Sequence, residues 1–484
     1  MQYSRHQLSD TIVALATPPG VGAIGVIRLS GPQALSIVQS VFKGKDLTKQ
    51  PGHTAHFGAL LTDEGEVLDE VLVTIFKAPN SYTGEDTAEV SCHGSPFILQ
   101  KAIELFISKG ARMAQPGEFT LRAFLNGKMD LSQAEAVADL IAANSAAAHK
   151  VAMRQMRGGF GKQIQQLRQQ LIDFASLIEL ELDFSEEDVE FANRDQLRKL
   201  VLEILNLLED LIRSFRLGNV IRRGVPTVIA GRPNAGKSTL LNALLAEERA
   251  IVSEVPGTTR DTIEEVLNIK GVEFRLIDTA GIREAQDQIE AIGVEKTMEK
   301  VRQASLLVYV FDVGNTKLDE VLSDLDKLRS EEMQLLVVCN KMDTDPYFKP
   351  EWLTNPTDPT IPEYFFTEGK RPNSTPYTLN PEHIITLSAL HGMNIPYLRE
   401  KLYEMVMAGG SLESPVVTNT RHLEALEKAA GSLRDVLKGM DEGITSDFIA
   451  MDIRRALTYL GEITGEVGVE DLLGNIFSRF CIGK

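Results

Sequence analysis

The sequence predicts a multidomain protein with an α+β amino-terminal domain, an all-α domain, and an α/β domain inserted into the all-α one. Three observations predict this architecture. The chain has 484 residues, which is too long for one ordinary domain. Its pattern passes from short β-branched runs to long helical periodicity, then to alternating strands and helices, and finally back to helical periodicity. A glycine-containing loop pattern directly follows the apolar run 225–230.

We place the amino-terminal domain at residues 1–127, because short apolar runs alternate there with turn signals. The runs 11–16 and 23–29 should form two strands across a Pro-Pro-Gly turn, and the run 71–76 another strand. Residues 20–25 also fit the dinucleotide pattern GxGxxG. That fingerprint needs a strand before it and a helix after it, whereas here a strand follows. We therefore predict a hairpin turn at this place.

The all-α domain is expected in two parts, residues 128–219 and 411–484. Helical periodicity begins near Leu131, is interrupted at 158–159, and after an acidic break continues to about Leu217. Such long helices need partners to bury their apolar stripes.

The α/β domain is expected at residues 220–410. Its segment 346–381 holds eight prolines and the only tryptophan, Trp352. We expect an extended surface insertion there without much regular structure, and we assign it no chemistry.

Composition limits the function. The chain is 43% hydrophobic, and no apolar run approaches the ~18–20 residues that span a bilayer. The first residues lack the apolar core of a secretory signal, so we expect a cytoplasmic protein without membrane contact. The net charge of −18 argues against a general nucleic-acid-coating surface, but not against a specific RNA partner. Cys92, Cys339 and Cys481 have no metal-ligand spacing, which indicates neither a zinc site nor a disulfide framework.

The loop at 231–238 fits the pattern GxxxxGK[ST] between an apolar strand and a helix. Its glycines let backbone N–H groups wrap around phosphates, and the helix that begins near Lys237 adds its positive end. Lys237 should reach the β- and γ-phosphates, and Ser238 should bind Mg²⁺.

A second motif selects the base. Asn340, Lys341 and Asp343 follow an apolar strand, and the Asp carboxylate can accept hydrogen bonds from N1–H and the 2-amino group of guanine. Adenine offers neither donor and would leave that charge unpaired. The run 388–390, Ser-Ala-Leu, resembles the loop whose backbone contacts the guanine oxygen.

Two further motifs complete a Ras-like P-loop GTPase. The run 278–281, Asp-Thr-Ala-Gly, ends another strand, and Thr259 within 257–261 is the expected second Mg²⁺ ligand. The expected GTP-contacting residues are Asn234, Ala235, Gly236, Lys237, Ser238, Thr239, Ser253, Glu254, Val255, Pro256, Gly257, Thr258, Thr259, Asp278, Thr279, Ala280, Gly281, Asn340, Lys341, Asp343, Ser388, Ala389 and Leu390.

The departures from Ras bear on the mechanism. Ile282 occupies the position of the glutamine that orients the attacking water, so another group must do this. Glu290 is the candidate, as one acid among several downstream. No obvious arginine finger is present, and the Asn234 side chain could bind a monovalent cation between the phosphates.

Taken together, these features resemble the MnmE (TrmE) family of tRNA-modification GTPases. The resemblance is carried by the nucleotide motifs and by the runs 10–14, 116–120, 131–136 and 480–484, of which the last ends in Cys-Ile-Gly-Lys. The nucleotide motifs alone would also suit a ribosome-assembly GTPase of the Era or Der type, which should carry a basic RNA-binding appendage. A third alternative, a purely structural or signalling GTPase, would have no small ligand in the amino-terminal domain.

The resemblance implies a homodimer that forms a heterotetramer with an FAD-containing flavoprotein, MnmG (GidA). The complex would add an aminomethyl or carboxymethylaminomethyl group to C5 of the wobble uridine, U34, of certain tRNAs. A tetrahydrofolate derivative, 5-formyl- or 5,10-methylene-tetrahydrofolate, would supply one carbon. GTP and K⁺ would bring the two G domains together, and hydrolysis would let them separate.

The resemblance also implies roles for individual residues, each carried over onto a matching position. Lys237, Glu290 and Cys481 would be catalytic, with Glu290 orienting water. The K⁺ ligands would be Asn234, Ser253, Val255 and Thr258, and the Mg²⁺ ligands Ser238 and Thr259. The folate contacts would be Arg28, Glu85, Lys128 and Lys484.

Overall fold

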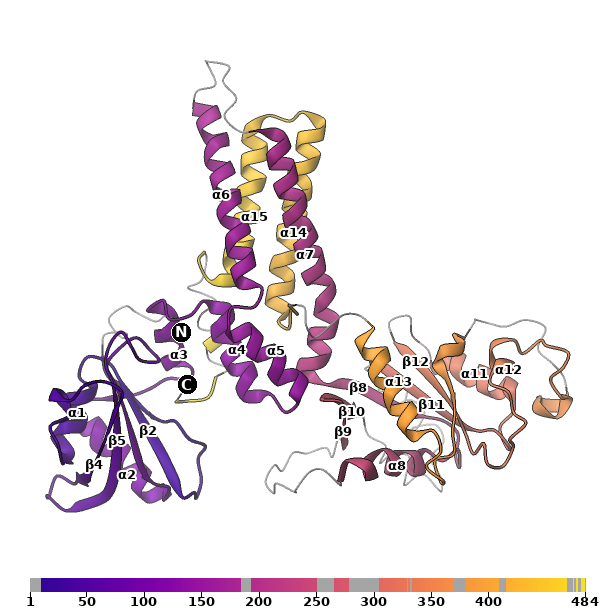
Figure 1. The fold of residues 1–484 in the computed structure, drawn as a ribbon, viewed down its shortest axis with the longest axis horizontal. Helices are drawn as coiled ribbons and strands as arrows, with labels where there is room; N and C mark the ends of the chain where they lie inside the picture. Colours follow the sequence, from indigo (N-terminus) through magenta and orange to yellow (C-terminus); the bar gives the residue numbers. More distant parts are fainter. Residues whose placement is uncertain are drawn as a thin grey trace. The chain divides into compact units, whose positions relative to one another are not determined.

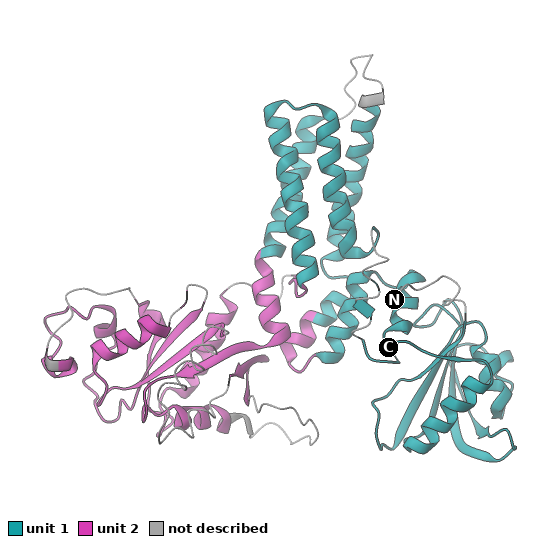
Figure 2. Cartoon of the chain, turned by 180° about the vertical axis from the view of Figure 1, so that it is seen from behind, with its two compact units in different colours: residues 1–142, 152–212, 420–484 teal, residues 143–151, 213–419 magenta. Residues whose placement is uncertain are grey.

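The computed structural model describes residues 10–183, 193–249, 265–277, 304–328, 330, 333–369, 379–408, 415–467, 473, 476–477 and 480–483. The chain divides into two compact units (Figure 2). Unit 1 comprises Met1–Ala142, Ala152–Ile212 and Thr420–Lys484, and unit 2 comprises Ala143–Val151 and Arg213–Asn419. Within the described residues, no helix is long and apolar enough to cross a membrane.

Unit 1 contains a seven-stranded sheet of order β3-β4-β5-β6-β2-β1-β7 (Figure 1). Buried and more exposed residues alternate along β5, so one face of the sheet points to an apolar core. Helices α1 and α2 contribute to this core and cover that face. The strands are β1 Ile12–Leu15, β2 Ile24–Ser30, β3 Phe42–Lys43, β4 Thr54–Leu61, β5 Val67–Phe76, β6 Thr87–His93 and β7 Arg112–Met113. The helices are α1 Ala34–Val41, α2 Pro96–Ser108 and α3 Glu118–Leu125.

The predicted amino-terminal hairpin is confirmed. β1 and β2 pair antiparallel, from Ile12 opposite Ser30 to Leu15 opposite Ile27. The GxGxxG segment, residues 20–25, covers the end of the connection and the first two residues of β2, so a strand rather than a helix continues from it. The interpretation of this segment as a turn is therefore correct.

Unit 1 also contains a bundle built from helices that are far apart in the sequence. α14 packs against α15, and α15 packs against α6. The buried residues of α14 recur at helical spacing, for example Ala425, Ala429 and Val436, and form the stripe that such a bundle requires. The helices are α4 Leu131–Ala142, α5 Ala146–Met156, α6 Gly161–Asp183, α7 Arg194–Arg223, α14 Thr420–Glu442 and α15 Ser446–Thr464, of which α5 and α7 extend into unit 2.

One predicted helix end is wrong. The sequence suggested that the second long helix stops at about Leu217, but α7 continues to Arg223. Gly218 lies inside this helix. A side chain would not fit there, because a Cβ at this position would lie 2.0 Å from the carbonyl oxygen of Val417. The glycine therefore allows the returning segment to approach the helix closely and does not end it.

Unit 2 is an α/β domain with the strand order β13-β12-β11-β8-β10-β9, parallel except for β9 (Figure 1). β11 is buried throughout, as expected for a central strand that is covered on both faces. The strands are β8 Val225–Ala230, β9 Glu265–Ile269, β10 Val272–Leu276, β11 Leu306–Asp312, β12 Gln334–Asn340 and β13 Ile384–Thr386. The helices include α8 Lys237–Arg249, α11 Leu318–Leu328, α12 Glu351–Thr354 and α13 Ile395–Met407.

The proline-rich segment differs from its prediction. Residues 346–369 of this segment form α12 and the short 3₁₀ helices η4 Glu363–Phe365 and η5 Thr367–Gly369, and are not extended. Trp352 is 7% exposed, and its ring lies 4.8 Å from that of Phe365. Both side chains belong to the apolar core beside β11, so burial of aromatic rings orders this insertion.

Candidate nucleotide site and amino-terminal polar site

The predicted phosphate loop connects β8 to α8 and lies at the carboxyl end of the parallel sheet, where ligands of such sheets bind. Two of its glycines are required by close approaches. A Cβ at Gly231 would lie 1.9 Å from the carbonyl oxygen of Val310, and one at Gly236 would lie 2.2 Å from Nδ2 of Asn340. Both glycines have positive φ, 149° and 93°, so the loop can curl tightly with its amides available for phosphate.

Lys237, the first residue of α8, is held by the loop itself. Its Nζ donates to the carbonyl oxygens of Gly231 at 2.7 Å and Arg232 at 2.8 Å. Burial lowers the pKa of this ammonium. The lysine thus stands inside the loop, and Ser238 and Thr239 follow it as exposed residues.

The Asn340 side chain connects three loops. Its Nδ2 donates to the carbonyl oxygen of Ala235 at 2.8 Å, and its Oδ1 accepts from the amide of Ala389 at 3.0 Å. The side chain is 2% exposed. The phosphate loop, the loop after β12 and the loop after β13 are therefore fixed relative to one another by one amide group, whose two ends suit these two partners.

Two of the residues predicted to contact the base lie at this edge. Asp343 and Ser388 come from the loops after β12 and β13. Ser388 Oγ has no hydrogen bond of regular geometry within the described part of the chain, yet its hydroxyl is the main influence that lowers the pKa of the Asp343 carboxyl. His391 Nε2 lies 3.7 Å from Asp343 Oδ2. An ionised carboxylate is the acceptor that guanine requires.

Lys341 has a partner that sequence reasoning missed. Its Nζ lies 2.7 Å from Oδ2 of Asp312, which is 4% exposed at the end of β11. Burial by itself raises the pKa of Asp312, but hydrogen bonds from Lys341 and Asn315 and from the Gly314 amide bring it below its ordinary value. Asp312 could have been found, because it ends a buried parallel strand at the ligand-binding edge.

Part of the predicted site lies outside the described residues. These residues are Ser253, Glu254, Val255, Pro256, Gly257, Thr258, Thr259, Asp278, Thr279, Ala280, Gly281, Glu290 and Lys484. Among the described ones, Asn234 is exposed with φ 61°, Ala389 is 5% exposed, and Leu390 is 74% exposed.

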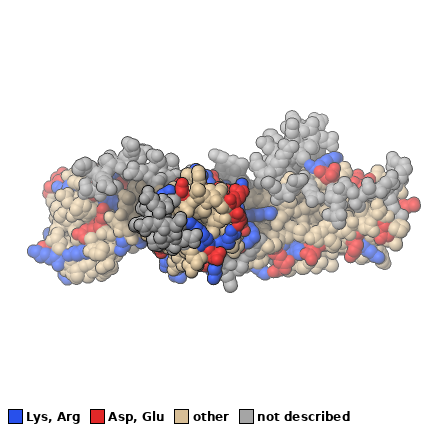
Figure 3. All heavy atoms as spheres, turned by 90° about the horizontal axis from the view of Figure 1, so that it is seen from above, with Lys and Arg blue, Asp and Glu red and all other residues tan. Residues whose placement is uncertain are grey.

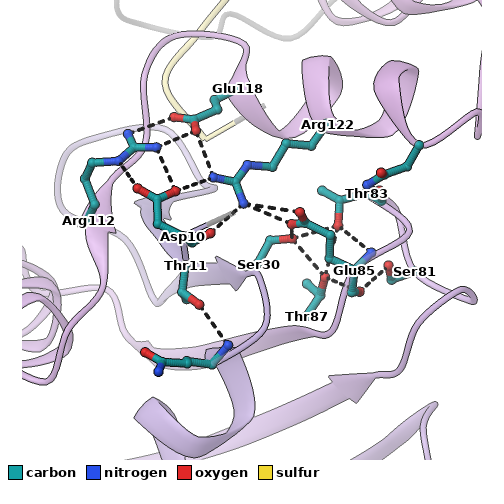
Figure 4. A network of polar contacts seen from close by, with 12 residues as sticks. Asp10, Thr11, Ser30, Ser81, Thr83, Glu85, Thr87, Arg112, Glu118 and Arg122 are labelled. Carbon is teal, nitrogen blue, oxygen red and sulfur yellow. Dashed lines mark hydrogen bonds and ion pairs between the residues drawn. The ribbon is translucent and has the colours of Figure 1, made fainter. Parts of the chain in front are cut away.

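Three predicted folate contacts lie in or beside one loop of the amino-terminal domain, residues 79–86. Arg28 lies over the ring of Tyr82, with 5.5 Å from Cζ to the ring centroid, and Lys128 Nζ donates to the carbonyl oxygen of Pro79 at 2.9 Å. Glu85 belongs to the same loop, and its carboxylate accepts a hydrogen bond from Arg122, which is part of a network of charged side chains (Figure 4).

We call this network the amino-terminal ion network and define it as Asp10, Glu85, Arg112, Glu118 and Arg122 (Figure 4). Arg122 is 1% exposed and donates to Asp10 at 2.8 Å, to Glu118 at 3.0 Å and to Glu85 at 3.2 Å. Arg112 donates to Asp10 at 2.7 Å and to Glu118 at 2.6 Å. Burial acts to raise the pKa of Asp10, but hydrogen bonds from the two arginines lower it.

The carboxylate of Glu85 is thereby fixed at the edge of this network. Ser30 Oγ donates to its Oε2 at 2.7 Å, and Arg122 donates to both oxygens. No motif in the sequence connects these three residues, which lie on β2, on the loop 79–86 and on α3. Only the fold brings them together.

The cysteines differ in their surroundings. Cys92 and Cys339 are buried, and burial raises the pKa of both thiols, that of Cys92 to about 12. Such thiols are poor nucleophiles at neutral pH. Cys481 is exposed, and its carbonyl oxygen accepts a hydrogen bond of 3.4 Å from the amide of Gly117. A Cβ at Gly483 would lie 2.1 Å from the carbonyl oxygen of Leu15, so the carboxyl-terminal segment packs on the amino-terminal domain.

Comparisons with known proteins agree with this architecture. Residues 11–128 match the family described as "GTP-binding protein TrmE N-terminus", and residues 131–481 match the "MnmE helical domain". An Era structure from Aquifex aeolicus, bound to GDP and AlF4⁻, has 22% identity to this chain and a TM-score of 0.24, covering 43% of this chain and 65% of that one. That similarity is too low to bear on function.

Relatives of full length are much more similar. A protein of Cytophaga hutchinsonii named "tRNA modification GTPase MnmE" is 54% identical over 98% of each chain. Proteins of the same name from Christiangramia forsetii and Flavobacterium johnsoniae are 52% and 51% identical, over 99% and 98% of this chain and 100% and 99% of theirs. With both family matches and identities of this size along the whole length, the chain belongs to the MnmE (TrmE) family.

Proposed function

We propose that this protein is a GTP hydrolase that acts in tRNA modification. Together with an FAD-containing MnmG (GidA) flavoprotein, it adds an aminomethyl or carboxymethylaminomethyl group to C5 of the wobble uridine, U34, of certain tRNAs. Family membership along nearly the whole chain supports the tRNA part. One observation carries the GTP-dependent part: the Asn340 side chain joins the phosphate loop to the loops that read guanine.

The proposed nucleotide site acts through the phosphate loop and the loops after β12 and β13. Loop amides bind the phosphates, and Lys237 exchanges the carbonyl oxygens of Gly231 and Arg232 for phosphate oxygens. Asp343 accepts from the guanine edge, which adenine cannot satisfy. A nucleotide without a triphosphate leaves the loop amides and Lys237 with fewer phosphate oxygens, and one without guanine leaves Asp343 without its two donors. Both kinds of nucleotide should therefore bind more weakly than GTP.

Two cations belong to the proposal. Ser238 at the start of α8 and Thr259 would hold Mg²⁺, and Asn234, Ser253, Val255 and Thr258 would hold K⁺. The exposed, left-handed position of Asn234 in the phosphate loop fits a ligand beside the phosphates. Bound cations supply positive charge next to the phosphate oxygens. Glu290 would orient the water in the place of the glutamine that Ile282 replaces.

A homodimer through the amino-terminal domain, in a heterotetramer with the flavoprotein, completes the proposed cytoplasmic assembly. The motion of the two G domains, as they approach and separate, would be transmitted to the helical domain through α7. Continuity of this helix and its ties to the returning segment support the route: Val417 N donates to Ser214 Oγ at 3.0 Å, and Gly218 allows the close approach.

The amino-terminal domain would bind a tetrahydrofolate derivative through Arg28, Glu85, Lys128 and Lys484. A pterin ring presents an N–H and an amino group side by side, as guanine does. The fixed carboxylate of Glu85 fits such a donor pair. Cys481, which is exposed on the segment packed against this domain, is the thiol proposed to take part in the modification chemistry.

Nucleoside mass spectrometry tests the main proposal. Cells that lack the protein should lose the wobble-uridine modification, and the wild-type chain should restore it. Lys237→Ala should fail to restore it, whereas the control Glu400→Gln, which breaks a surface ion pair with Lys270, should succeed. Unchanged uridine modification in the deletion strain would overturn the tRNA assignment.

The cation and folate parts have separate tests. Steady-state GTP turnover should rise strongly when K⁺ replaces Na⁺, and Asn234→Ala should remove most of that difference. Equal wild-type rates in both salts would exclude potassium.

Equilibrium dialysis with 5-formyl-tetrahydrofolate should give binding to the wild type that Glu85→Gln weakens at least about tenfold, as loss of a charged acceptor implies. Glu104→Gln, a surface glutamate paired with Lys101, is the matched control and should bind as the wild type does. Equal binding by both variants contradicts the role of Glu85.

A further inference from the structure

The side chain of Arg232 connects the phosphate loop to α11. Its Nε donates to Asp324 Oδ2 at 2.8 Å, and its NH2 donates to Asp324 Oδ1 at 3.3 Å. Its NH1 lies 2.6 Å from Oε1 of Glu320. Asp324 and Glu320 are one helical turn apart and face the same side of α11, so they form a two-carboxylate receptor for the guanidinium fork.

This receptor is anchored to the sheet. Tyr309 on β11 is 1% exposed, and its hydroxyl donates to Asp324 Oδ2 at 2.8 Å. Burial, followed by the neighbouring Asp324 carboxylate, raises the pKa of Tyr309, so the hydroxyl remains a donor at neutral pH. Asp324 therefore receives hydrogen bonds from both the central strand and the phosphate loop.

The backbone of the same arginine holds the phosphate-binding lysine. The carbonyl oxygen of Arg232 accepts from Lys237 Nζ at 2.8 Å and from the amide of Ala235 at 3.3 Å. The position of this carbonyl thus sets where Lys237 rests before phosphates bind. A tether on the side chain of Arg232 fixes that position, because side chain and carbonyl belong to one residue.

Surface stabilisation alone does not account for this arrangement. The Arg232 side chain is 37% exposed, and single ion pairs at such exposure contribute little to folding. Here Arg232 makes a bidentate contact with Asp324 and a second ion pair with Glu320, and the buried Tyr309 in turn holds Asp324. The P-loop pattern leaves the residue at this position open, so phosphate binding by the motif does not require an arginine.

We propose that Arg232 is a positioning residue for nucleotide binding. Its tether to Asp324 and Glu320 holds the first arm of the phosphate loop so that Lys237 and the loop amides meet the phosphates. Nothing in this role involves the base, which Asp343 reads at the other side of the pocket.

The test measures affinity of the full chain for GTP and GDP by titration calorimetry. Arg232→Ala should weaken both by about tenfold, as expected for the loss of a charged hydrogen-bond group. Arg232→Lys should lie in between, because an ammonium cannot form the bidentate contact. The ratio of GTP to inosine-triphosphate affinity should stay unchanged, since inosine differs from guanosine only in lacking the 2-amino group.

A double-mutant cycle tests the route through α11. Arg232→Ala combined with Asp324→Ala should bind GTP no more weakly than Arg232→Ala alone. Fully additive losses would show that the two residues act independently and would overturn the tether. Glu400→Gln, which breaks the Lys270 ion pair on other elements of unit 2, is the control and should leave affinity unchanged.

Folding is separated from positioning by stoichiometry. If Arg232 only stabilised the fold, its variants would bind with a reduced number of sites at unchanged affinity, and that result contradicts the proposal. Affinity of Arg232→Ala within twofold of the wild type at full stoichiometry would also contradict it. If Arg232→Ala does not fold, Asp324→Asn and Arg232→Lys decide by the same criteria.

Discussion

The nucleotide pocket of unit 2 and the amino-terminal ion network of unit 1 are both polar, but they are assembled differently. In the pocket, the binding groups stand in short motifs, each directly after a strand of a parallel sheet. In the network, Arg122 reaches the carbonyl oxygen of Asp10 across 112 positions of sequence and Glu85 across 37. The pocket depends on local sequence and sheet order, whereas the network depends on the complete amino-terminal fold.

Burial separates the two regions as well. The side chains of Asp343 and Lys341 are partly exposed to solvent, as the predicted role in nucleotide binding requires. Arg122 and Glu118 are each 1% exposed and form an ion pair with one another inside the network. Substitutions in the nucleotide site should therefore change GTP binding and leave folding intact, whereas substitutions of the buried network residues Arg122 and Glu118 should lower stability and leave GTP binding intact.

The charge on the face drawn in Figure 3 does not form a general nucleic-acid-binding surface. On the face drawn in Figure 3, acidic and basic side chains are interspersed. With a net charge of −18, a tRNA contact would have to be local and specific.

The largest effect is expected in the network. Arg122→Met removes the partner of three carboxylates and should destabilise unit 1 by about 3–5 kcal/mol. Thermal unfolding measures this loss, and calorimetry should find GTP affinity unchanged. Arg434→Ala, which breaks an exposed pair with Glu209, is the control and should cost less than about 1 kcal/mol. A loss of GTP affinity in Arg122→Met would break the comparison.

The pocket should respond in the opposite way. Asp343→Asn should weaken GTP binding about 100-fold, because an amide cannot accept both guanine donors, and should leave the unfolding temperature unchanged. Titration calorimetry and thermal unfolding check the two parts. The neighbouring Asp345→Asn serves as the control, since the partly exposed Asp345 side chain accepts from the Tyr347 amide, and it should bind as the wild type does. A large stability loss in Asp343→Asn would contradict the distinction.

Asp312 sharpens the comparison, because it is a buried group that supports a pocket residue. Asp312→Asn removes the charged partner of Lys341, and GTP affinity should fall about tenfold. The unfolding temperature should fall as well, since the side chain is buried. Asp326→Asn on the exposed side of α11 is the control. Unchanged affinity would show that Lys341 needs no fixed partner.

The smallest effect concerns acid stability of the helical part. Burial acts to raise the pKa of Glu135, but the His422 imidazole and then the Arg421 guanidinium lower it from 4.5 to about 2. A carboxyl whose pKa is lower in the folded than in the unfolded protein stabilises the fold at pH values above its unfolded-state pKa. This contribution is lost as the pH falls through its folded-state pKa. Glu135→Gln should therefore unfold at lower temperature at pH 7, by about 2–4 °C per kcal/mol lost.

That temperature difference should close as the pH falls from 4.5 towards 2. Thermal scans of both proteins across this range measure it. Glu179→Gln, which breaks an exposed pair with Arg454, is the control and should follow the wild type at all pH values. A difference that stays constant with pH would show that Glu135 acts by packing alone.

Local pattern was enough for the features that depend on neighbours in sequence. The β1–β2 hairpin followed from two apolar runs across a proline-glycine turn, and the strand, loop and helix around Lys237 followed from one motif. The break between α5 and α6 was visible at 158–159, where both glycines have positive φ. Periodicity and turn chemistry act over a few residues, so one sequence reveals them.

The errors and omissions have a different physical origin. Gly218 was taken for the end of a helix, but it accommodates the carbonyl oxygen of Val417, about 200 positions away. Trp352 was placed in an extended segment, but it packs with Phe365 into the core beside β11. In both cases a contact between distant segments overrides the local signal.

By itself, the sequence indicated the phosphate loop between β8 and α8 and predicted an aspartate that reads guanine, because each of these motifs lies within a few positions of the chain. Only the tertiary structure decided that Arg232 is tied to α11, that Asp312 holds Lys341, and that Arg122 gathers three carboxylates. Ion pairs and buried hydrogen bonds form between side chains that folding brings within about 3 Å, and charge alone does not identify the partner along the chain.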